Sequence, residues 1–348
     1  MWRRGAVETK NVSAHAVEHE IQHPYAFNVS GPRNVPSINW RDLINSTWKD
    51  ANYKRTVMAC FIQAVYLLEL DRQESRSLAP KWWKPFKYKL VQPLIDHRDA
   101  SIFGAVLEWD RAAALQDLVV MKPSGAPKAV LALRGTLLKA PTMRRDIQDD
   151  LRFLAWESLK GSVRFTTALT ALSSLSQKHG AANVVIAGHS LGAGFALQVG
   201  KELAKRGVCV EAHLFNPPSV SLASSLKSVG ERAGVAWRML KSVIPMRGGG
   251  GGDADVARSV ETEVKQVWMP LLYVNNSDYI CCYYSDGGGA EVSGGGGAKM
   301  FVASKGKQSF VEAHGLEQWW SDDLELEMAI NNSKLISRQL QSLYKDYP

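Results

Sequence analysis

Apolar and polar positions follow two periods along this chain, and each period predicts one kind of element. Between Tyr53 and Glu74 the apolar residues recur every three or four positions, which places them on one face of a helix. Two short apolar runs, 102–109 and 130–133, are bounded by turn-forming or charged residues, as buried strands are. The first part of the chain is therefore predicted to hold one long helix and two strands.

The middle of the chain alternates between the two periods. Helical spacing between Lys160 and His179 ends at Gly180, and an apolar run at 183–187 follows at once. A helix is predicted over 191–206 and another buried run over 208–215. Alternating strands and helices form a parallel sheet, so the sequence predicts an α/β protein with a mostly parallel central sheet flanked by helices.

The last third of the chain predicts two more strands and a closing helix. The strands are expected at 271–274 and 300–303, and the helix at 324–343. Residues 1–24 are polar and without periodicity, which predicts a flexible N-terminal tail. We expect residues 25–348 to form a single domain, with glycine-rich loops at 247–255 and 286–298.

The composition fits a globular protein, with 45% hydrophobic and 22% charged residues. No apolar run reaches the roughly eighteen residues of a membrane-spanning helix, and no apolar stretch follows the N-terminal arginines as in a secretory signal. The four cysteines are too few for a disulfide scaffold. These features predict a cytoplasmic protein.

The net charge of +8 is compatible with several anionic partners and selects none of them. The densest basic and aromatic segment is 81–89, which contains Trp82 and Trp83 among lysines. This segment is either an ordinary surface stretch with anchored tryptophans or a peripheral membrane contact. No nucleic-acid-binding motif accompanies it, so we expect no nucleic-acid partner.

A nucleophile elbow is predicted at Gly188-His189-Ser190-Leu191-Gly192, which matches G-x-S-x-G between a strand and a helix. The serine of such a turn takes a strained positive φ, and the flanking glycines remove the Cβ atoms that would collide there. The pattern predicts Ser190 as a nucleophile at a helix N-terminus.

A serine hydroxyl needs a histidine base and a carboxylate that orients the histidine. In α/β-hydrolases these follow the serine in the order acid, then histidine. His213 lies inside an apolar run, so His314 is the predicted base. The other histidines precede Ser190: His15, His19, His23, His97, His179 and His189.

The acid is predicted to be Asp278, because it follows the strand 271–274 closely and open α/β sheets build their sites at the carboxyl ends of strands. Asp286 is the first alternative, and Asp253 and Asp255 are others. These three aspartates lie in or beside glycine runs, which would hold a carboxylate loosely.

Acyl transfer also needs two hydrogen-bond donors for the tetrahedral oxyanion. The N–H of Leu191 is expected to supply the first. The run 131–133 leads into Arg134-Gly135-Thr136, a turn of the kind that supplies the second donor, and we expect it to be the N–H of Thr136.

These motifs together resemble the class 3 (fungal-type) lipase family of α/β-hydrolases. The likeness extends over about residues 25–345 and points to a plant branch often labelled GDSL esterase/lipase, although the GDSL tetrapeptide itself is absent. The segments that carry it are: Ser30-Gly31-Pro32, Ser37-Ile38-Asn39-Trp40, Asp71-Arg72-Gln73-Glu74, Leu133-Arg134-Gly135-Thr136, Ala187-Gly188-His189-Ser190-Leu191-Gly192, Val274-Asn275-Asn276-Ser277-Asp278 and Ala313-His314-Gly315-Leu316-Glu317-Gln318-Trp319-Trp320.

Two departures from the family limit what the resemblance implies. Family members commonly carry a proline soon after the acid, whereas Tyr279-Ile280-Cys281-Cys282 follows Asp278 here. Secreted relatives place an amphipathic lid after the oxyanion strand, and the corresponding stretch, 137–150, is highly charged.

The resemblance implies a serine carboxyl-ester hydrolase, a lipase or esterase that cleaves lipid-derived acyl esters through an acyl-enzyme without metal or cofactor. The alternative is a lipase-like signalling or interaction protein that keeps the fold without catalysis. The oligomeric state does not follow from the sequence.

Overall fold

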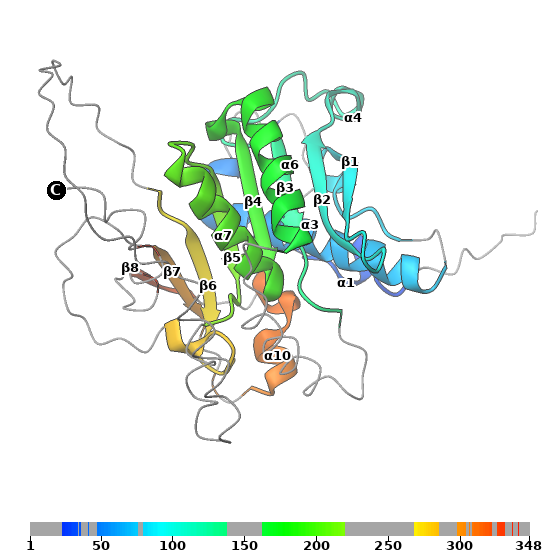
Figure 1. Ribbon diagram of the computed structural model, residues 1–348. Coiled ribbons are helices and arrows are strands. Elements are labelled where there is room, and N and C mark those ends of the chain that lie inside the picture. Colours follow the sequence, from blue (N-terminus) through cyan, green and yellow to red (C-terminus); the bar gives the residue numbers. More distant parts are fainter. Residues whose placement is uncertain are drawn as a thin grey trace, which may run out of the picture.

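In the part of the chain that the structure describes, eight strands form one sheet in chain order, and five of them run parallel (Figure 1). The computed structural model describes residues 23–33, 35, 41, 47–75, 79–137, 162–219, 268–284, 298–303, 306, 308–321, 326–330, 336 and 340. Strands β3 to β7 pair in parallel, whereas β1, β2 and β8 pair antiparallel at the two edges. The strands are β1 Tyr88–Ile95, β2 Ile102–Trp109, β3 Ala129–Leu133, β4 Val184–His189, β5 Glu211–Phe215, β6 Leu271–Asn275, β7 Lys299–Ala303 and β8 Leu326–Ile330.

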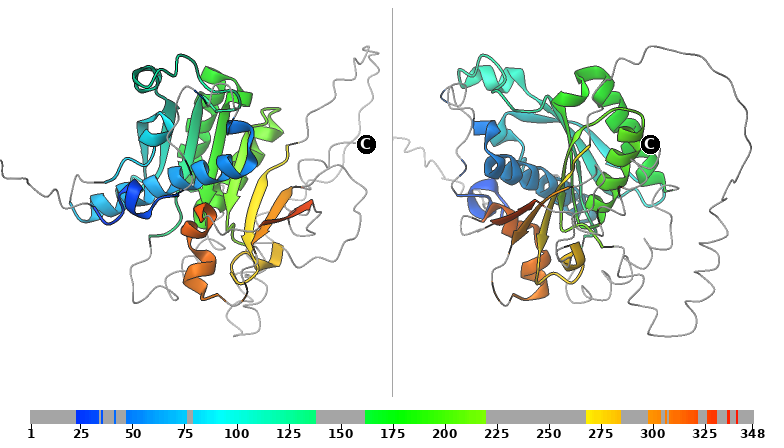
Figure 2. Two further views of the ribbon diagram at one scale, coloured as in Figure 1. Left: turned by 180° about the vertical axis from the view of Figure 1, so that it is seen from behind. Right: turned by 90° about the vertical axis from the view of Figure 1, so that its left-hand side faces the viewer.

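Helices cover both faces of this sheet. Helix α3 (Ala51–Gln73) lies across one face, and α6 (Val163–His179) and α7 (Leu191–Lys205) pack side by side on the other (Figures 1 and 2). The shorter helical elements are α1 Phe27–Ser30, α4 Arg111–Gln116, α10 Phe310–His314 and the 3-10 turns η1 Thr47–Lys49, η2 Lys84–Phe86, η4 Ala181–Asn183, η6 Cys282–Tyr284 and η7 Leu316–Trp320. The predicted α/β-hydrolase architecture, a mostly parallel sheet flanked by helices, is confirmed.

The burial of strand β3 on both faces explains why its sequence is a continuous apolar run. All five of its residues are buried, because its two faces belong to two different cores. Leu131 and Leu133 pack with α6 and α7, whereas Val130 and Ala132 pack with α3. A strand buried on both faces cannot show the apolar–polar alternation of a half-exposed strand.

Two of the predicted helices begin at a side chain that caps their first turn. Asp50 caps α3 by accepting hydrogen bonds from the backbone N–H groups of Asn52 and Tyr53. Ser162 caps α6 in the same way, and Gly180, with φ of 81°, ends that helix.

The segment around Trp82 and Trp83 is the first correction to the sequence analysis. Both side chains are buried, with 0% and 6% exposure, and the Trp82 indole N–H donates to the Tyr25 carbonyl. Trp82 packs against Phe27 and Trp320 with ring centroids 5.3 and 5.4 Å apart. Membrane contact through these tryptophans, one of the two interpretations of this segment, is contradicted because both side chains form part of the core beneath α3. The other interpretation, a segment with anchored tryptophans, fits the structure.

The expected closing helix is the second correction. Residues 326–330 form β8, which pairs antiparallel with β7 at the sheet edge. The apolar residues of this segment alternate with others at period two, which is a strand pattern that the analysis overlooked. Ile336 and Leu340, in the second half of the predicted helix, are helical and buried.

Several predicted segments lie outside the described residues. They are the tail up to residue 22, the glycine-rich loops apart from Ala298, and the charged stretch 138–150. Among the helices in the described part of the chain, none is long and apolar enough to cross a membrane.

Candidate active site

The turn between β4 and α7 holds Ser190 in a strained conformation. Its φ is 53° and its ψ is −123°, and its backbone N–H donates to the Phe215 carbonyl at 2.9 Å. A Cβ atom on Gly188 would lie 2.3 Å from the Gly192 carbonyl oxygen, which leaves no room for any side chain at Gly188. The turn therefore has the tight geometry that the elbow motif predicts.

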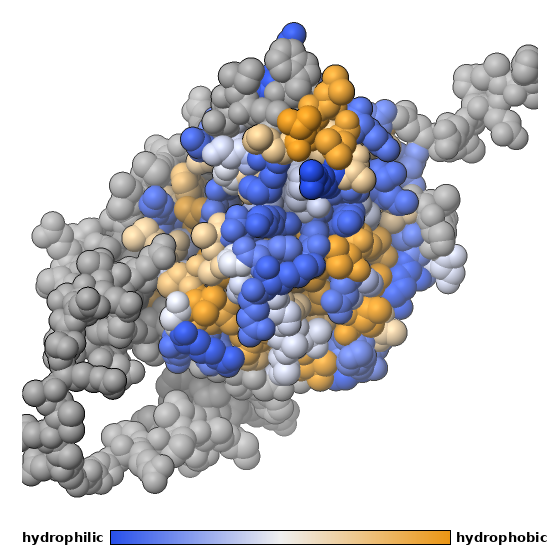
Figure 3. Space-filling view, turned by 90° about the horizontal axis from the view of Figure 1, so that it is seen from above, coloured by the Kyte–Doolittle hydropathy of each residue, from blue (hydrophilic) through white to orange (hydrophobic). Residues whose placement is uncertain are grey.

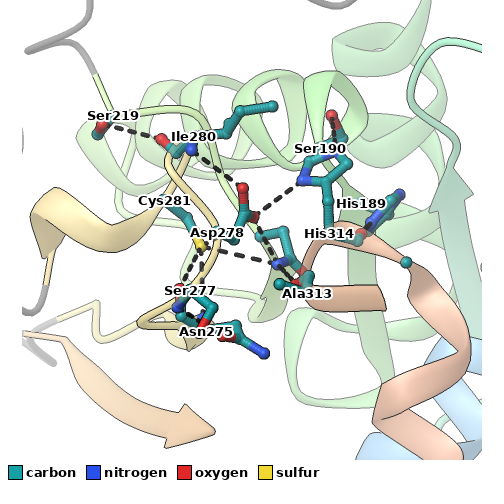
Figure 4. A network of polar contacts seen from close by, with 12 residues as sticks. His189, Ser190, Ser219, Asn275, Ser277, Asp278, Ile280, Cys281, Ala313 and His314 are labelled. Atoms are coloured by element: carbon teal, nitrogen blue, oxygen red, sulfur yellow. Dashed lines mark hydrogen bonds and ion pairs between the residues drawn. The ribbon is translucent and has the colours of Figure 1, made fainter. Parts of the chain in front are cut away.

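Ser190, His314 and Asp278 lie in one hydrogen-bonded line (Figure 4). The His314 Nε2 atom is 3.0 Å from Ser190 Oγ, and His314 Nδ1 is 2.9 Å from Asp278 Oδ2. Three separate segments supply these residues: the β4–α7 turn, the turn after β6, and the last residue of α10. All three are buried, with 8%, 5% and 0% exposure in the order serine, histidine, aspartate.

The carboxylate of Asp278 is kept ionised by its surroundings. Burial alone would raise its pKa, but the charge and hydrogen bond of His314 lower it. The Ile280 N–H at 3.0 Å and the Asn216 amide at 2.7 Å also donate to this carboxylate. The pKa of Asp278 is therefore below its ordinary value.

An ionised Asp278 determines the tautomer of His314. A carboxylate only accepts hydrogen bonds, so Nδ1 of His314 must donate to it. In the neutral imidazole Nε2 is then an acceptor, and it faces the hydroxyl of Ser190. This arrangement lets the imidazole take a proton from that hydroxyl.

The loop after β3 lies directly against Ser190. A Cβ atom on Gly135 would be 2.8 Å from Ser190 Cβ. The Gly135 N–H is already engaged, because it donates to the Tyr66 hydroxyl at 2.8 Å. The next residue, Thr136, is half-buried, and its N–H remains the predicted second oxyanion donor. Leu191, the predicted first donor, begins α7, and its N–H has no acceptor within the helix.

His189 connects this loop to His314. Its Nδ1 lies 2.8 Å from the Tyr66 hydroxyl, and its Nε2 lies 2.9 Å from the His314 carbonyl oxygen. Burial, together with the nearby charge of His314, lowers the pKa of His189 to about 3, so this imidazole is neutral. Its Nε2 must donate to the carbonyl, and the Tyr66 hydroxyl then donates to its Nδ1.

The sequence analysis missed Tyr66 and Asn216 as parts of this site, and it named His189 only as an elbow residue. No motif signals a side chain that acts through hydrogen bonds between distant segments. Among the other histidines, His213 lies on β5, and its ring nitrogens form hydrogen bonds with Glu211 and Tyr273. Asp253, Asp255 and Asp286 lie outside the described residues.

Comparisons with known proteins give one curated relative and several structures. The relative is "GDSL esterase/lipase At4g10955" from Arabidopsis thaliana, 28% identical over 88% of this chain and 98% of its own length. No family model matches the chain. A triacylglycerol lipase from Penicillium expansum aligns over 80% of this chain and 86% of its own, with 12% identity and a TM-score of 0.38.

A lipase from Rhizopus microsporus var. chinensis aligns over 83% of this chain and 82% of its own, with 10% identity and a TM-score of 0.36. The Arabidopsis relative aligns over nearly its whole length and carries the label that the sequence motifs had indicated. This chain is therefore similar to a plant protein that is labelled GDSL esterase/lipase.

Proposed function

We propose that this protein is a serine carboxyl-ester hydrolase that cleaves acyl esters through an acyl-enzyme on Ser190. The observation that carries the proposal is the continuous line from Ser190 Oγ to His314 to Asp278, with distances of 3.0 and 2.9 Å, at a strained strand-to-helix turn. The label of the Arabidopsis relative, an esterase/lipase, supports the same reaction class.

In the first half of the reaction Ser190 Oγ attacks the carbonyl carbon of the ester while His314 Nε2 takes the hydroxyl proton. The tetrahedral intermediate then collapses, and His314 returns the proton to the departing alkoxide, so that an alcohol leaves. Asp278 stabilises the imidazolium that forms in between, without itself taking the proton.

In the second half His314 removes a proton from a water molecule, and the resulting hydroxide attacks the acyl carbon on Ser190. This attack forms a second tetrahedral intermediate. As it collapses, the bond between the acyl carbon and Ser190 Oγ breaks, His314 returns its proton to Ser190 Oγ, and a carboxylic acid leaves. Protein groups and water account for every bond made and broken in these steps.

The negative oxygen of both intermediates needs two donors near Ser190. We assign them to the N–H groups of Leu191 and Thr136. Two observations support the assignment: Leu191 begins α7, and the loop before Thr136 touches Ser190. Loss of one such donor raises the barrier by about 3–4 kcal/mol in other acyl-transfer enzymes.

The substrate class we propose is an acyl ester of lipid origin, and the esterase/lipase label of the Arabidopsis relative supports it. We place the protein in the cytoplasm because of its few cysteines. A lipase-like interaction protein without turnover is the alternative function, and the kinetic test below separates the two.

The acid is tested by changing Asp278→Asn and Asp286→Asn and measuring hydrolysis of short and medium acyl esters. Asparagine has nearly the same shape as aspartate, but it favours the wrong tautomer of the His314 imidazole. The corresponding change in a serine protease lowers kcat by about 10⁴. We expect a loss of that order for Asp278→Asn and nearly wild-type rates for Asp286→Asn. The opposite ranking would move the acid to Asp286, and a folded wild type that hydrolyses no ester would favour the interaction protein.

A further inference from the structure

Asn216 occupies an unusual position directly after β5. Its φ is 46°, in the left-handed region, and its side chain is fully buried. Its backbone N–H donates to the Tyr273 carbonyl at 2.8 Å, which fixes the turn against β6. Non-glycine residues adopt this conformation rarely, and asparagine is among those that tolerate it best.

The side-chain amide of Asn216 makes hydrogen bonds to three other segments. Its Nδ2 donates to Asp278 Oδ2 at 2.7 Å and to the Ala313 carbonyl at 3.0 Å. Its Oδ1 accepts from the Trp319 indole N–H at 2.6 Å. An indole N–H only donates and a carboxylate only accepts, so these partners define which end of the amide faces which group.

This amide joins the two loops that carry the acid and the base. Asp278 follows β6, and Ala313 directly precedes His314 in α10 (Figure 4). The Cys281 thiol also lies 3.1 Å from Asp278 Oδ2, but a thiol is a weak donor. The Asn216 amide is therefore the strongest fixed neutral donor to the same oxygen that His314 uses.

We propose that Asn216 is a positioning residue of the triad, which aims Asp278 Oδ2 at His314 and withdraws part of its negative charge. The proposal rests on the ester-hydrolase function above. Without the amide, Asp278 is free to rotate, so the imidazole is held less well. The carboxylate, having lost a hydrogen-bond donor, then also carries more negative charge beside His314 and attracts the imidazolium form more strongly.

The test compares Asn216→Gly with the wild type in ester hydrolysis as a function of pH. Glycine retains the left-handed backbone and removes only the amide. We expect kcat to fall about 10- to 100-fold, the scale of one hydrogen bond to a charged group, with KM within about twofold. The acid limb of the kcat/KM profile should move to higher pH.

A second variant, Asn216→Asp, retains the size of the side chain and helps to separate positioning from packing. When protonated, the introduced carboxyl can donate to Asp278 as the amide does. When ionised, it places a second negative charge beside that carboxylate. We expect partial activity at low pH that is lost as the pH rises, which a purely structural role of Asn216 does not predict.

The matched control is Asn183→Gly, which removes a half-buried amide that donates to the His179 carbonyl at the opposite end of β4. It should leave kcat and the pH profile unchanged. An Asn216→Gly variant that folds and keeps both wild-type kcat and the wild-type acid limb would overturn the proposal. If instead the wild type hydrolyses no ester, the proposed function fails first, so the two failures are distinguishable.

Discussion

At the residue scale, Gly135 is the position where a single methyl group should be most damaging to the site. A Cβ atom there would lie 2.7 Å from the Tyr66 hydroxyl, 2.8 Å from Ser190 Cβ and 2.9 Å from the His189 carbonyl oxygen. At least one of these groups must shift to accept Gly135→Ala. Because displacements of about 1 Å near reacting atoms can cost about 100-fold in rate, we expect kcat to fall by at least that order.

The measurement is kcat for ester hydrolysis by Gly135→Ala, with folding checked by circular dichroism. Gly194→Ala in α7 is the matched control, since its nearest heavy atom, in the Pro218 ring, lies 3.3 Å from the new methyl group. Alanine also favours the helix by up to about 1 kcal/mol over glycine, so the control should retain activity. Equal activity in both variants would show that the loop after β3 has no part in catalysis.

The residues that the sequence could and could not identify differ in a physical way. The sequence identifies Ser190 by its motif, Asp278 by its place just after a strand, and His314 by its place in the order serine, acid, histidine. All of these signals can be read along the chain. Asn216 and Tyr66 act through hydrogen bonds to segments 62 and 123 residues away. Such contacts depend on packing of the whole sheet, which local patterns do not describe.

At the element scale, Glu69 joins α3 to the strands that lead into the site. This carboxylate is 1% exposed, accepts from the Ile102 N–H at 2.8 Å and pairs with Arg72 at 2.7 Å. Arg134, the residue before Gly135, approaches it to 3.7 Å. Burial alone would raise its pKa, but hydrogen bonds from Arg72, Gln73 and the Ile102 N–H, with the charge of Arg134, lower it to about 2.

This shift predicts a pH dependence of stability with a definite sign. A carboxyl whose pKa is lower in the folded than in the unfolded state stabilises the fold at pH values above its ordinary pKa, which is 4.5 for glutamate. This stabilisation is lost as the pH falls from 4.5 toward the folded-state pKa of about 2. Glu69→Gln should therefore unfold at lower urea concentration than the wild type at pH 7. The difference in urea midpoint between the wild type and Glu69→Gln should become smaller as the pH falls from 4.5 toward about 2.

The control for this measurement is Glu202→Gln, which removes an exposed pair with Arg206 on α7. Exposed pairs contribute about 0–1 kcal/mol, so this change should be nearly silent at every pH. If the difference in urea midpoint between the wild type and Glu69→Gln stays constant from pH 7 to pH 2, the Glu69 carboxylate does not stabilise the fold through its ionised form.

Elements with a strong period were predictable, and those at the sheet edges were not. Helices α3, α6 and α7 and strand β4 follow clear patterns, and side chains cap the first turns of α3 and α6. Strand β1 was missed because Pro93 and shifts in its pairing register with β2 interrupt its alternation. Strand β8 was predicted as part of a helix because Leu326, Glu327, Met328 and Ala329 also favour helices, but pairing with β7 makes this segment a strand.

At the scale of the whole molecule, the sheet brings three loops far apart in sequence to one site. The parallel strands β4, β5 and β6 end at the same edge, where Ser190, Asn216 and Asp278 follow them. α10 then places His314 between the serine and the aspartate. This convergence follows from strand order, which explains why the fold class and the residues that meet at this edge could be predicted before any geometry was known.

The surface of the molecule was less predictable than its interior. The space-filling view from above shows polar and apolar side chains intermixed (Figure 3). The basic and aromatic segment 81–89 suggested an exposed binding patch, yet its tryptophans are buried and only lysines such as Lys81 and Lys84 are exposed. Composition reports which residues are present in a segment but not the face toward which each one points.

The most direct test of the account is covalent labelling of the purified protein with a fluorophosphonate, with the modified residue located by mass spectrometry. An activated serine attacks phosphorus and expels fluoride, whereas an ordinary serine does not. We predict labelling at Ser190 in the wild type, none at that site in Ser190→Ala, and much slower labelling in His314→Ala. A folded wild type that stays unlabelled, or that is labelled at another serine, would contradict the assignment of Ser190 as the nucleophile.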